Sequence, residues 1–330
     1  MFKITKQNIE RWSQEGYRNT FGMAIVEIGK TNQDVVVLTA DLAGTTRVIK
    51  FAENFPDRFF QAGIAEQNLI GMAAGLASCG KIPVVTTFAT FASMRCCEQL
   101  RSDVAYTGFN VKVIGVDSGI SMGTLGATHN AIEDMGIIRS IPNILILSPC
   151  DGLELVKAIN AAIEQRGPVY VRMGGGKSLK PVYKENYEFN VGKAVTLREG
   201  KDGTIIATGT MVSKALEAAD ILSGDNISLR VINVHTIKPV DEDIIVKAAN
   251  ETKNIITIEE HSVIGGLGSA VADVMAQAGV GTLIKIGLPD AFGPIAPYQE
   301  LLAYYGLTPE KITVTIKQFF IRGIPCYALK

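Results

Sequence analysis

Residues 61–91 have the sequence QAGIAEQNLIGMAAGLASCGKIPVVTTFATF, and the rest of the chain is organised around them. Apolar residues recur at helical spacing over 65–79, and 83–87 has the composition of a buried strand. Glu66 precedes Leu69 by three residues, which places its carboxylate on the apolar face of the predicted helix. The stretch therefore predicts a helix whose first acidic side chain faces packed protein rather than water.

A glutamate in the first turn of a helix is ordinary by itself, because it complements the helix dipole and can complete a capping box. Two aromatic residues, Phe88 and Phe91, follow the predicted strand three residues apart, and such pairs usually belong to a core. Ligands of α/β proteins, however, bind at the carboxyl ends of parallel strands. The combination of Glu66 with these aromatic residues at such a strand end indicates a binding site.

The composition is that of a globular chain with room for two domains, since it has 330 residues, 47% of them apolar and 20% charged. A net charge of −1 gives no support for binding to nucleic acid or to a membrane surface. The start of the chain has no signal-peptide pattern, and no apolar run is long enough to span a bilayer. The odd number of cysteines and the lack of a CxxC pair favour reduced thiols and a cytoplasmic location. The cysteines are Cys79, Cys96, Cys97, Cys150 and Cys326.

Strands and helices alternate along both halves of the chain, which predicts an α/β fold made of two doubly wound parallel sheets. The expected strands of the first half are 35–38, 83–87, 111–116, 143–147 and 169–172, and its helices are 16–28, 65–79, 93–103, 129–139 and 151–165. Those of the second half are strands 204–208, 228–234, 254–259 and 282–287, and helices 211–222, 241–250, 266–278 and 297–304. The polar residues in between predict domains at 1–188 and 203–330, with a linker at 189–202.

The segments Gly63–Asn68 and Thr87–Phe91 resemble the pyrimidine-binding domain of thiamine-diphosphate enzymes, in particular transketolase. Residues 233–239 and 260–266 resemble the C-terminal domain of the same family, so the resemblance covers nearly the whole chain. It implies that Glu66 is catalytic, because a carboxyl at N1′ of the cofactor's aminopyrimidine favours the tautomer that takes the proton from C2. The cofactor-binding residues that it implies are Asp41, Leu42, Ile64, Glu66, Phe88, Phe91 and Met94.

The family's anchor for magnesium and diphosphate is absent from this sequence. That anchor is a Gly-Asp-Gly motif followed some way downstream by an Asn, and nothing here matches it. The chain corresponds to the last two of the three domains of a full-length transketolase. We therefore expect a split enzyme, in which a separate N-terminal subunit carries Gly-Asp-Gly and most contacts to Mg²⁺ and diphosphate. The expected assembly is α2β2, and this chain, which supplies no metal ligand, should be inactive alone.

The resemblance also implies residues that face an anionic sugar-phosphate substrate. Arg18, Thr45 and Arg172 lie where transketolases bind the substrate phosphate, and three such groups at strand ends favour an anion. His129 matches the residue near the reaction centre and is the candidate for handling protons. Asp41 matches an acidic residue close to the cofactor at the subunit interface, although a helix-capping role is about as common for Asp.

Two further substrate-facing positions differ from the family pattern. Asp117 stands where transketolases have a His, and Leu125 stands where they have the Asp that contacts a substrate hydroxyl. Because Leu cannot accept a hydrogen bond, a hydroxyl facing it would remain unpaired. The sequence thus favours a ketose that lacks a hydroxyl or is branched at that carbon, such as apulose 4-phosphate, over xylulose 5-phosphate.

Other functions remain open from the sequence. A deoxyxylulose-phosphate synthase or the β subunit of a 2-oxo-acid dehydrogenase would share Gly63–Glu66, and Leu125 would suit an apolar donor such as pyruvate. A catalytically silent subunit that only stabilises an assembly is a third possibility. For His235 and His261 we favour structural roles, because neutral histidines at strand ends often only satisfy local hydrogen bonds.

Overall fold

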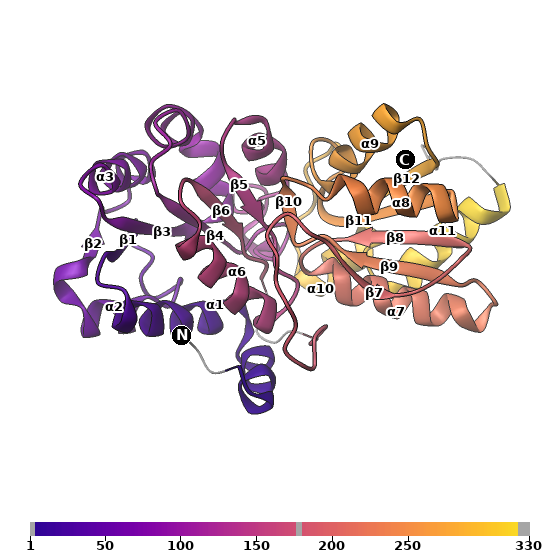
Figure 1. Ribbon diagram of the computed structural model, residues 1–330, viewed down its shortest axis with the longest axis horizontal. Coiled ribbons are helices and arrows are strands. Elements are labelled where there is room, and N and C mark those ends of the chain that lie inside the picture. Colours follow the sequence, from indigo (N-terminus) through magenta and orange to yellow (C-terminus); the bar gives the residue numbers. More distant parts are fainter. Residues whose placement is uncertain (1–3, 176–179, 323–330) are drawn as a thin grey trace.

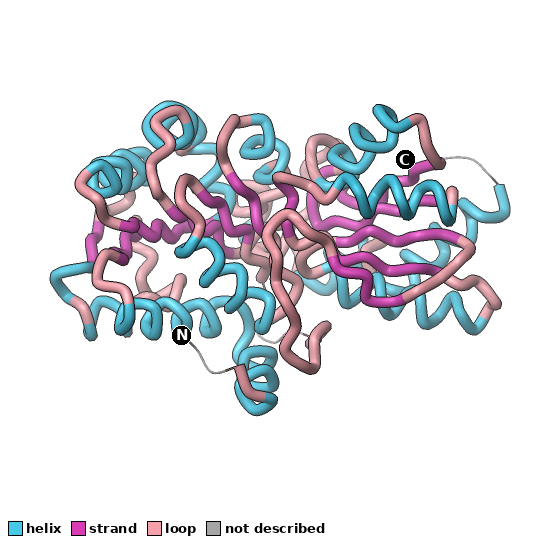
Figure 2. Tube along the Cα trace, viewed as in Figure 1, coloured by secondary structure: helices cyan, strands magenta, loops and turns pink. Residues whose placement is uncertain are grey.

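The computed structural model describes residues 4–175 and 180–322, and in this part the chain forms two α/β units side by side (Figure 1). The first unit is built on a seven-stranded sheet and the second on a five-stranded one (Figure 2). Both predicted sheets are therefore present, and each contains mostly parallel strand pairs with one antiparallel pair at an edge.

The first sheet has helices on both faces. Its strands, in spatial order, are β10 (Thr236–Lys238), β5 (Leu145–Leu147), β6 (Val169–Arg172), β4 (Lys112–Val116), β3 (Ile82–Phe88), β1 (Val35–Thr39) and β2 (Phe59–Gln61). One face packs against α1 (Lys6–Thr31), α2 (Ile49–Asn54) and α6 (Gly152–Glu164). The other packs against α3 (Glu66–Ser78), α5 (Asp134–Ser140) and the helical segments η2 (Phe91–Arg95), α4 (Cys97–Gln99) and η3 (Leu100–Ala105).

The second sheet has the strand order β12 (Thr282–Leu288), β11 (Asn254–Ser262), β8 (Gly203–Ala207), β9 (Leu229–Asn233) and β7 (Val195–Arg198). Helices α8 (Glu242–Thr252) and α9 (Leu267–Ala278) cover one face. The other face carries α7 (Met211–Gly224), α10 (Tyr298–Tyr304) and α11 (Pro309–Arg322). Two short 3-10 turns, η1 (Pro56–Arg58) and η4 (Gly123–Leu125), complete the described elements.

The two units are joined by more than the connecting chain. Strand β10 comes from the second half of the sequence but pairs antiparallel with β5 of the first sheet. Trp12 of α1 and Leu153 of α6 belong to the same buried cluster as Met211 of α7. Burial of this apolar surface stabilises one arrangement of the two units, and it positions the cavity between them that is described below.

The strands and helices follow the hydrophobic pattern of the sequence. All five residues of β1 (VVVLT) are buried, as expected for a central parallel strand covered on both faces. In α3, Glu66, Leu69, Ile70, Ala73 and Ala74 form the buried face, so the glutamate lies on the packed side of its helix. The helix expected from Gly16 instead begins at Lys6, with a break at Gly16, whose φ of 72° is accessible to glycine.

Other expectations differ in their boundaries. The helix expected over 129–139 begins only at Asp134, because a bridge between Gly119 and Ala131 holds the preceding residues in another conformation. The segment expected as one helix over 93–103 is a mixture of α- and π-helical turns. The stretch 189–202, expected as a linker, contains β7, and the expectations did not include α2, β10 or α11.

Cys79, Cys96, Cys97 and Cys150 are free thiols, and Cys326 lies outside the described residues. In the described part of the chain no helix combines the length and the apolar character needed to cross a membrane.

Candidate functional site

Glu66 is the first residue of α3, and its side chain is only 6% exposed. The preceding residue, Ala65, has no side-chain oxygen that could cap the helix, so Glu66 is not half of a capping box. Its Oε1 accepts a hydrogen bond from Nη1 of Arg95 at 3.0 Å, whereas Oε2 accepts none from the described residues. One carboxylate oxygen thus remains available to a ligand.

Aromatic rings gather beside this carboxylate. The ring centroids of Phe88 and Phe91 are 5.6 Å apart, and the planes are almost perpendicular. The ring of His129, which is distant in the sequence, lies next to both. Its centroid is 5.6 Å from the centroid of Phe88 and 5.3 Å from that of Phe91. Its Nδ1 is 2.9 Å from Oγ1 of Thr128. The structure therefore brings together both aromatic candidates and the histidine that the sequence analysis assigned to proton handling.

Arg95 is a member of this cluster that the sequence analysis missed. Its Cζ lies 3.6 Å from the centroid of the Phe91 ring, while its Nη1 donates to Glu66. It ends the π-helical turn η2, a rare conformation that occurs frequently at functional sites. The only signal in the sequence is its spacing of four residues from Phe91.

The remaining cofactor candidates lie on an open face rather than in an enclosed cavity. Ile64 is 77% exposed and Met94 is 54% exposed. Asp41 is also exposed, and its backbone N–H donates to Oε1 of Gln61. Leu42 is half-buried. An apolar rim around a buried carboxylate fits the pyrimidine half of thiamine diphosphate, provided that another surface covers it.

The described residues contain no cluster of three or more His, Cys, Asp or Glu side chains that could hold a metal ion.

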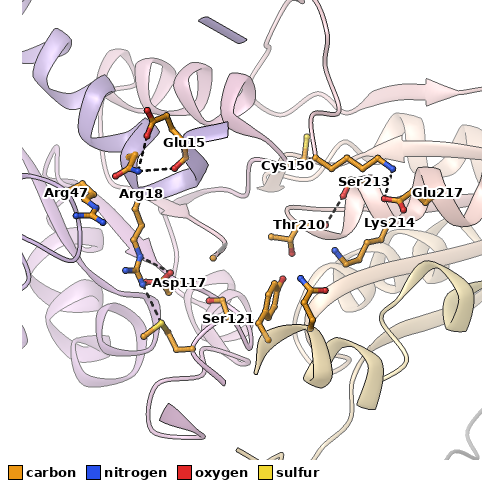
Figure 3. A pocket seen from close by; sticks show the side chains of 16 residues that line it. Glu15, Arg18, Arg47, Asp117, Ser121, Cys150, Thr210, Ser213, Lys214 and Glu217 are labelled. Carbon is orange, nitrogen blue, oxygen red and sulfur yellow. Dashed lines mark hydrogen bonds and ion pairs between the residues drawn. The ribbon is translucent and has the colours of Figure 1, made fainter. Parts of the chain in front are cut away.

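A cavity of about 850 Å³ lies between the two units (Figure 3). Arg18 and Asp117 point toward each other on the side of the first unit, and Thr210, Lys214 and Tyr298 come from the second. Nε of Arg18 donates to Oδ1 of Asp117 at 3.0 Å, and Nη2 contacts Oδ2. Burial raises the pKa of the Asp117 carboxyl, against the opposing effect of Arg18. The predicted substrate residues Arg18 and Asp117 thus form an ion pair.

Two other predicted substrate residues are Thr45 and Leu125. Thr45 is half-buried, and Leu125, in η4, is 47% exposed. Neither of them lines the cavity.

The structure corrects the expectation for Arg172. Its guanidinium is buried, and Nε lies 3.0 and 2.9 Å from the two oxygens of Asp134. Nη2 donates to the backbone oxygens of Ala131 and Glu260. Because its charge is neutralised and its donors are occupied inside the protein, Arg172 is not available to a substrate phosphate. It connects β6 with α5 and β11 instead.

Both remaining histidines have structural surroundings. Nε2 of His261 accepts a hydrogen bond from the Gly136 N–H at 3.2 Å, and Nδ1 donates to the Ser262 oxygen at 2.7 Å. His235 stacks on Phe189, with a distance of 4.1 Å between the ring centroids. Burial lowers the pKa of His261, and it lowers the pKa of His235 to about 4. Both rings are therefore neutral near neutral pH.

The chain matches two known domain families. Residues 14–177 match the family described as the pyrimidine-binding domain of transketolase, and residues 192–312 match its C-terminal domain. Together the two matches span most of the chain. The chain belongs to the transketolase family, whose members depend on thiamine diphosphate.

The chain has several relatives that are named as separate parts of a transketolase. It is 45% identical to a protein of Methanocaldococcus jannaschii assigned as a transketolase C-terminal section, covering 92% of this chain and 96% of that one. It is 40% identical to one of the subunits of the apulose-4-phosphate transketolase of Phocaeicola vulgatus, with the same two coverages. The chain is the C-terminal subunit of a split transketolase.

A solved structure of the same type, a split-gene transketolase described as an inactive beta4 tetramer, is 41% identical to the chain. It superposes with a TM-score of 0.82 over 92% of this chain and 97% of that one. The 1-deoxy-D-xylulose-5-phosphate synthase of Carboxydothermus hydrogenoformans is 36% identical, and the match covers only 48% of its length. The split transketolases are therefore the nearer comparison in both identity and extent.

Proposed function

We propose that this chain supplies the pyrimidine half of a two-subunit transketolase, which transfers a two-carbon ketol unit from a ketose phosphate to an aldose. The observation that carries the proposal is the buried Glu66 carboxylate, with one oxygen free of hydrogen bonds from the described residues, beside Phe91 on an open apolar rim. Bound thiamine diphosphate would supply the stabilised carbanion that this transfer requires.

Each residue of the cluster has a defined task in this proposal. Glu66 forms a hydrogen bond with N1′ of the aminopyrimidine and accepts it once N1′ is protonated, in surroundings with few competing waters. Phe91 offers a flat face for stacking, and Phe88 and His129 fix the orientation of that ring by their edge contacts. His129 is half-buried, with part of its ring still open to solvent, so it can exchange a proton with a substrate that enters above the rings.

A separate N-terminal subunit carrying Gly-Asp-Gly completes the site. It holds Mg²⁺ and the diphosphate, and it covers the exposed side chains of Ile64 and Met94. Two copies of each chain form the α2β2 assembly, in which each active site lies between unlike subunits. The beta4 assembly of the split-gene relative, described as inactive, agrees with a catalytic requirement for the other subunit.

Reconstitution tests this function. The chain is mixed with an N-terminal subunit that contains Gly-Asp-Gly, and ketol transfer is measured with thiamine diphosphate and Mg²⁺. We expect activity only with both subunits, in a particle whose mass by light scattering equals two copies of each. Ketol transfer by the chain alone, or none by the complex with any ketose tested, would overturn the proposal.

For the substrate we propose a ketose phosphate that is branched or lacks a hydroxyl at the carbon facing Leu125. Apulose 4-phosphate has the required shape, and its cleavage would yield dihydroxyacetone phosphate together with the transferred two-carbon unit. The relative that acts on this sugar is 40% identical to the chain. A panel of ketose phosphates, compared by kcat/KM in the complex, tests the proposal, and preference for xylulose 5-phosphate refutes it.

The apolar side chain of Leu125 also favours one alternative, in which the donor is a 2-oxo acid. Release of carbon dioxide from pyruvate by the reconstituted complex distinguishes this function from ketol transfer. A purely structural role is distinguished by Glu66→Gln, because a scaffold would lose no activity when that carboxylate is removed.

A further inference from the structure

Arg95 makes two contacts that define a flat position beside Glu66. Its guanidinium lies over the Phe91 ring, 3.6 Å from the ring centroid, and its Nη1 donates to Glu66 Oε1 at 3.0 Å. Phe88 and His129 meet the same ring at interplanar angles of 85° and 63°. Neither of them is stacked on Phe91, so Arg95 is the group that holds the stacked position.

These contacts involve the same two groups, the Glu66 carboxylate and the Phe91 ring, that the proposed function assigns to the aminopyrimidine. The guanidinium and the aminopyrimidine are both planar, both form a hydrogen bond with a carboxyl group, and both stack on an aromatic ring. Two flat groups cannot share one face of Phe91 at a stacking distance. Binding of the cofactor on that face therefore requires Arg95 to move.

The surroundings allow such a movement. The Arg95 side chain is 49% exposed, whereas Glu66 is 6% exposed and fixed in the first turn of α3. The arginine can therefore turn into solvent while the carboxylate and the Phe91 ring remain in place. The exposed Met94 beside it shows that this turn of the chain borders open space.

We propose that Arg95 is an internal competitor of thiamine diphosphate, which occupies the pyrimidine position and is displaced when the cofactor binds. This inference rests on the proposed function. It adds a control of cofactor affinity that resides in this subunit: the displaced arginine returns to Glu66 and Phe91 whenever the cofactor leaves, and it keeps the buried carboxylate paired.

The expected effect follows from the contacts that must break. These contacts are one half-exposed ion pair and one cation–π contact. Because both must break before the cofactor binds, they should reduce the affinity for thiamine diphosphate by about 5- to 30-fold. Removal of the guanidinium should restore that affinity. An arginine that only supported Glu66 would have the opposite effect, because its loss would weaken cofactor binding.

The test is the dissociation constant of thiamine diphosphate, measured by titration calorimetry on the complex with the N-terminal subunit at saturating Mg²⁺. Arg95→Ala should bind about 5- to 30-fold more tightly than the unchanged chain and associate faster in stopped-flow fluorescence. Arg95→Lys keeps the charge but not the flat stack, so its affinity should be intermediate. Arg101→Ala removes an exposed arginine of the same helical region and should leave the affinity unchanged.

Equal or weaker binding by Arg95→Ala would overturn the inference, and Arg95→Lys provides the same comparison of affinities should the alanine variant not fold. A complex that binds no thiamine diphosphate with any variant would instead refute the proposed function. The two failures are therefore distinguishable.

Discussion

Arg18 donates to Asp117 through Nε at 3.0 Å and through Nη2, so the guanidinium that faces the cavity is already paired with a carboxylate. The carboxylate of Asp117 decreases the positive charge that Arg18 would present to an anion in the cavity.

Asp117→Asn should therefore improve binding of a ketose with an anionic tail. Asn tolerates the positive φ of 55° at this position, so the fold should be preserved. We expect KM to decrease by about 3- to 10-fold with little change in kcat, because Arg18 regains its full charge. Glu217→Gln is the matched control, since it removes an acid from the same cavity without releasing Arg18. An increased KM would mean that Asp117 itself contacts the substrate.

Leu125 should determine which ketose is preferred. Leu125→Asp restores a hydrogen-bond acceptor, so kcat/KM for xylulose 5-phosphate relative to a branched ketose phosphate should rise by at least about 10-fold. Leu125→Ala shortens the side chain without adding an acceptor. In this variant the ratio of the two kcat/KM values should change much less. The same ratio in Leu125→Asp as in the unchanged chain would show that this position does not face the substrate.

The buried pair of Arg172 and Asp134 should contribute to stability rather than to substrate binding. Asp134→Asn leaves the arginine without a counter-charge and should cost about 3–5 kcal/mol, seen as a lower urea midpoint. Arg139→Gln breaks the more exposed pair with Asp273 and should cost less than about 1 kcal/mol. Equal losses in the two variants would contradict the assignment.

His235 should make the fold sensitive to acid. Burial lowers its pKa to about 4, so between its unfolded pKa and pH 4 the unfolded chain binds a proton that the folded chain does not, and stability falls as the pH decreases. His235→Phe keeps the stacking on Phe189 and removes the titration. The free energy of unfolding of the variant, minus that of the unchanged chain, should increase by about 2 kcal/mol when the pH is lowered from 7.5 to 5. Urea unfolding at both pH values measures this difference. A constant difference between the two proteins would contradict the prediction.

The sequence predicted those features that depend on local pattern. The spacing of hydrophobic residues predicts the buried strand β1 and the amphipathic helix α3. The same spacing predicts that Glu66 is buried. The motifs around Glu66 and Phe88 identified the family, because they lie within one short stretch of sequence.

Features that depend on distant contacts could not be predicted in this way. Strand β10 is too short to be recognised, and it forms because β5 offers an unpaired edge. The burial of Arg172 depends on Asp134, which lies in a different element. The position of Arg95 depends on a π-helical turn, whose hydrophobic pattern resembles that of an ordinary helix.

The role of Glu66 is tested most directly by exchange of the C2 hydrogen of thiamine diphosphate bound to the complex of both subunits, followed by NMR in deuterated water. We predict that Glu66→Gln slows this exchange by about 10²- to 10⁴-fold while the complex still assembles and binds the cofactor. Exchange in Glu66→Gln that is as fast as in the unchanged enzyme would contradict a role of this carboxylate in activating the cofactor.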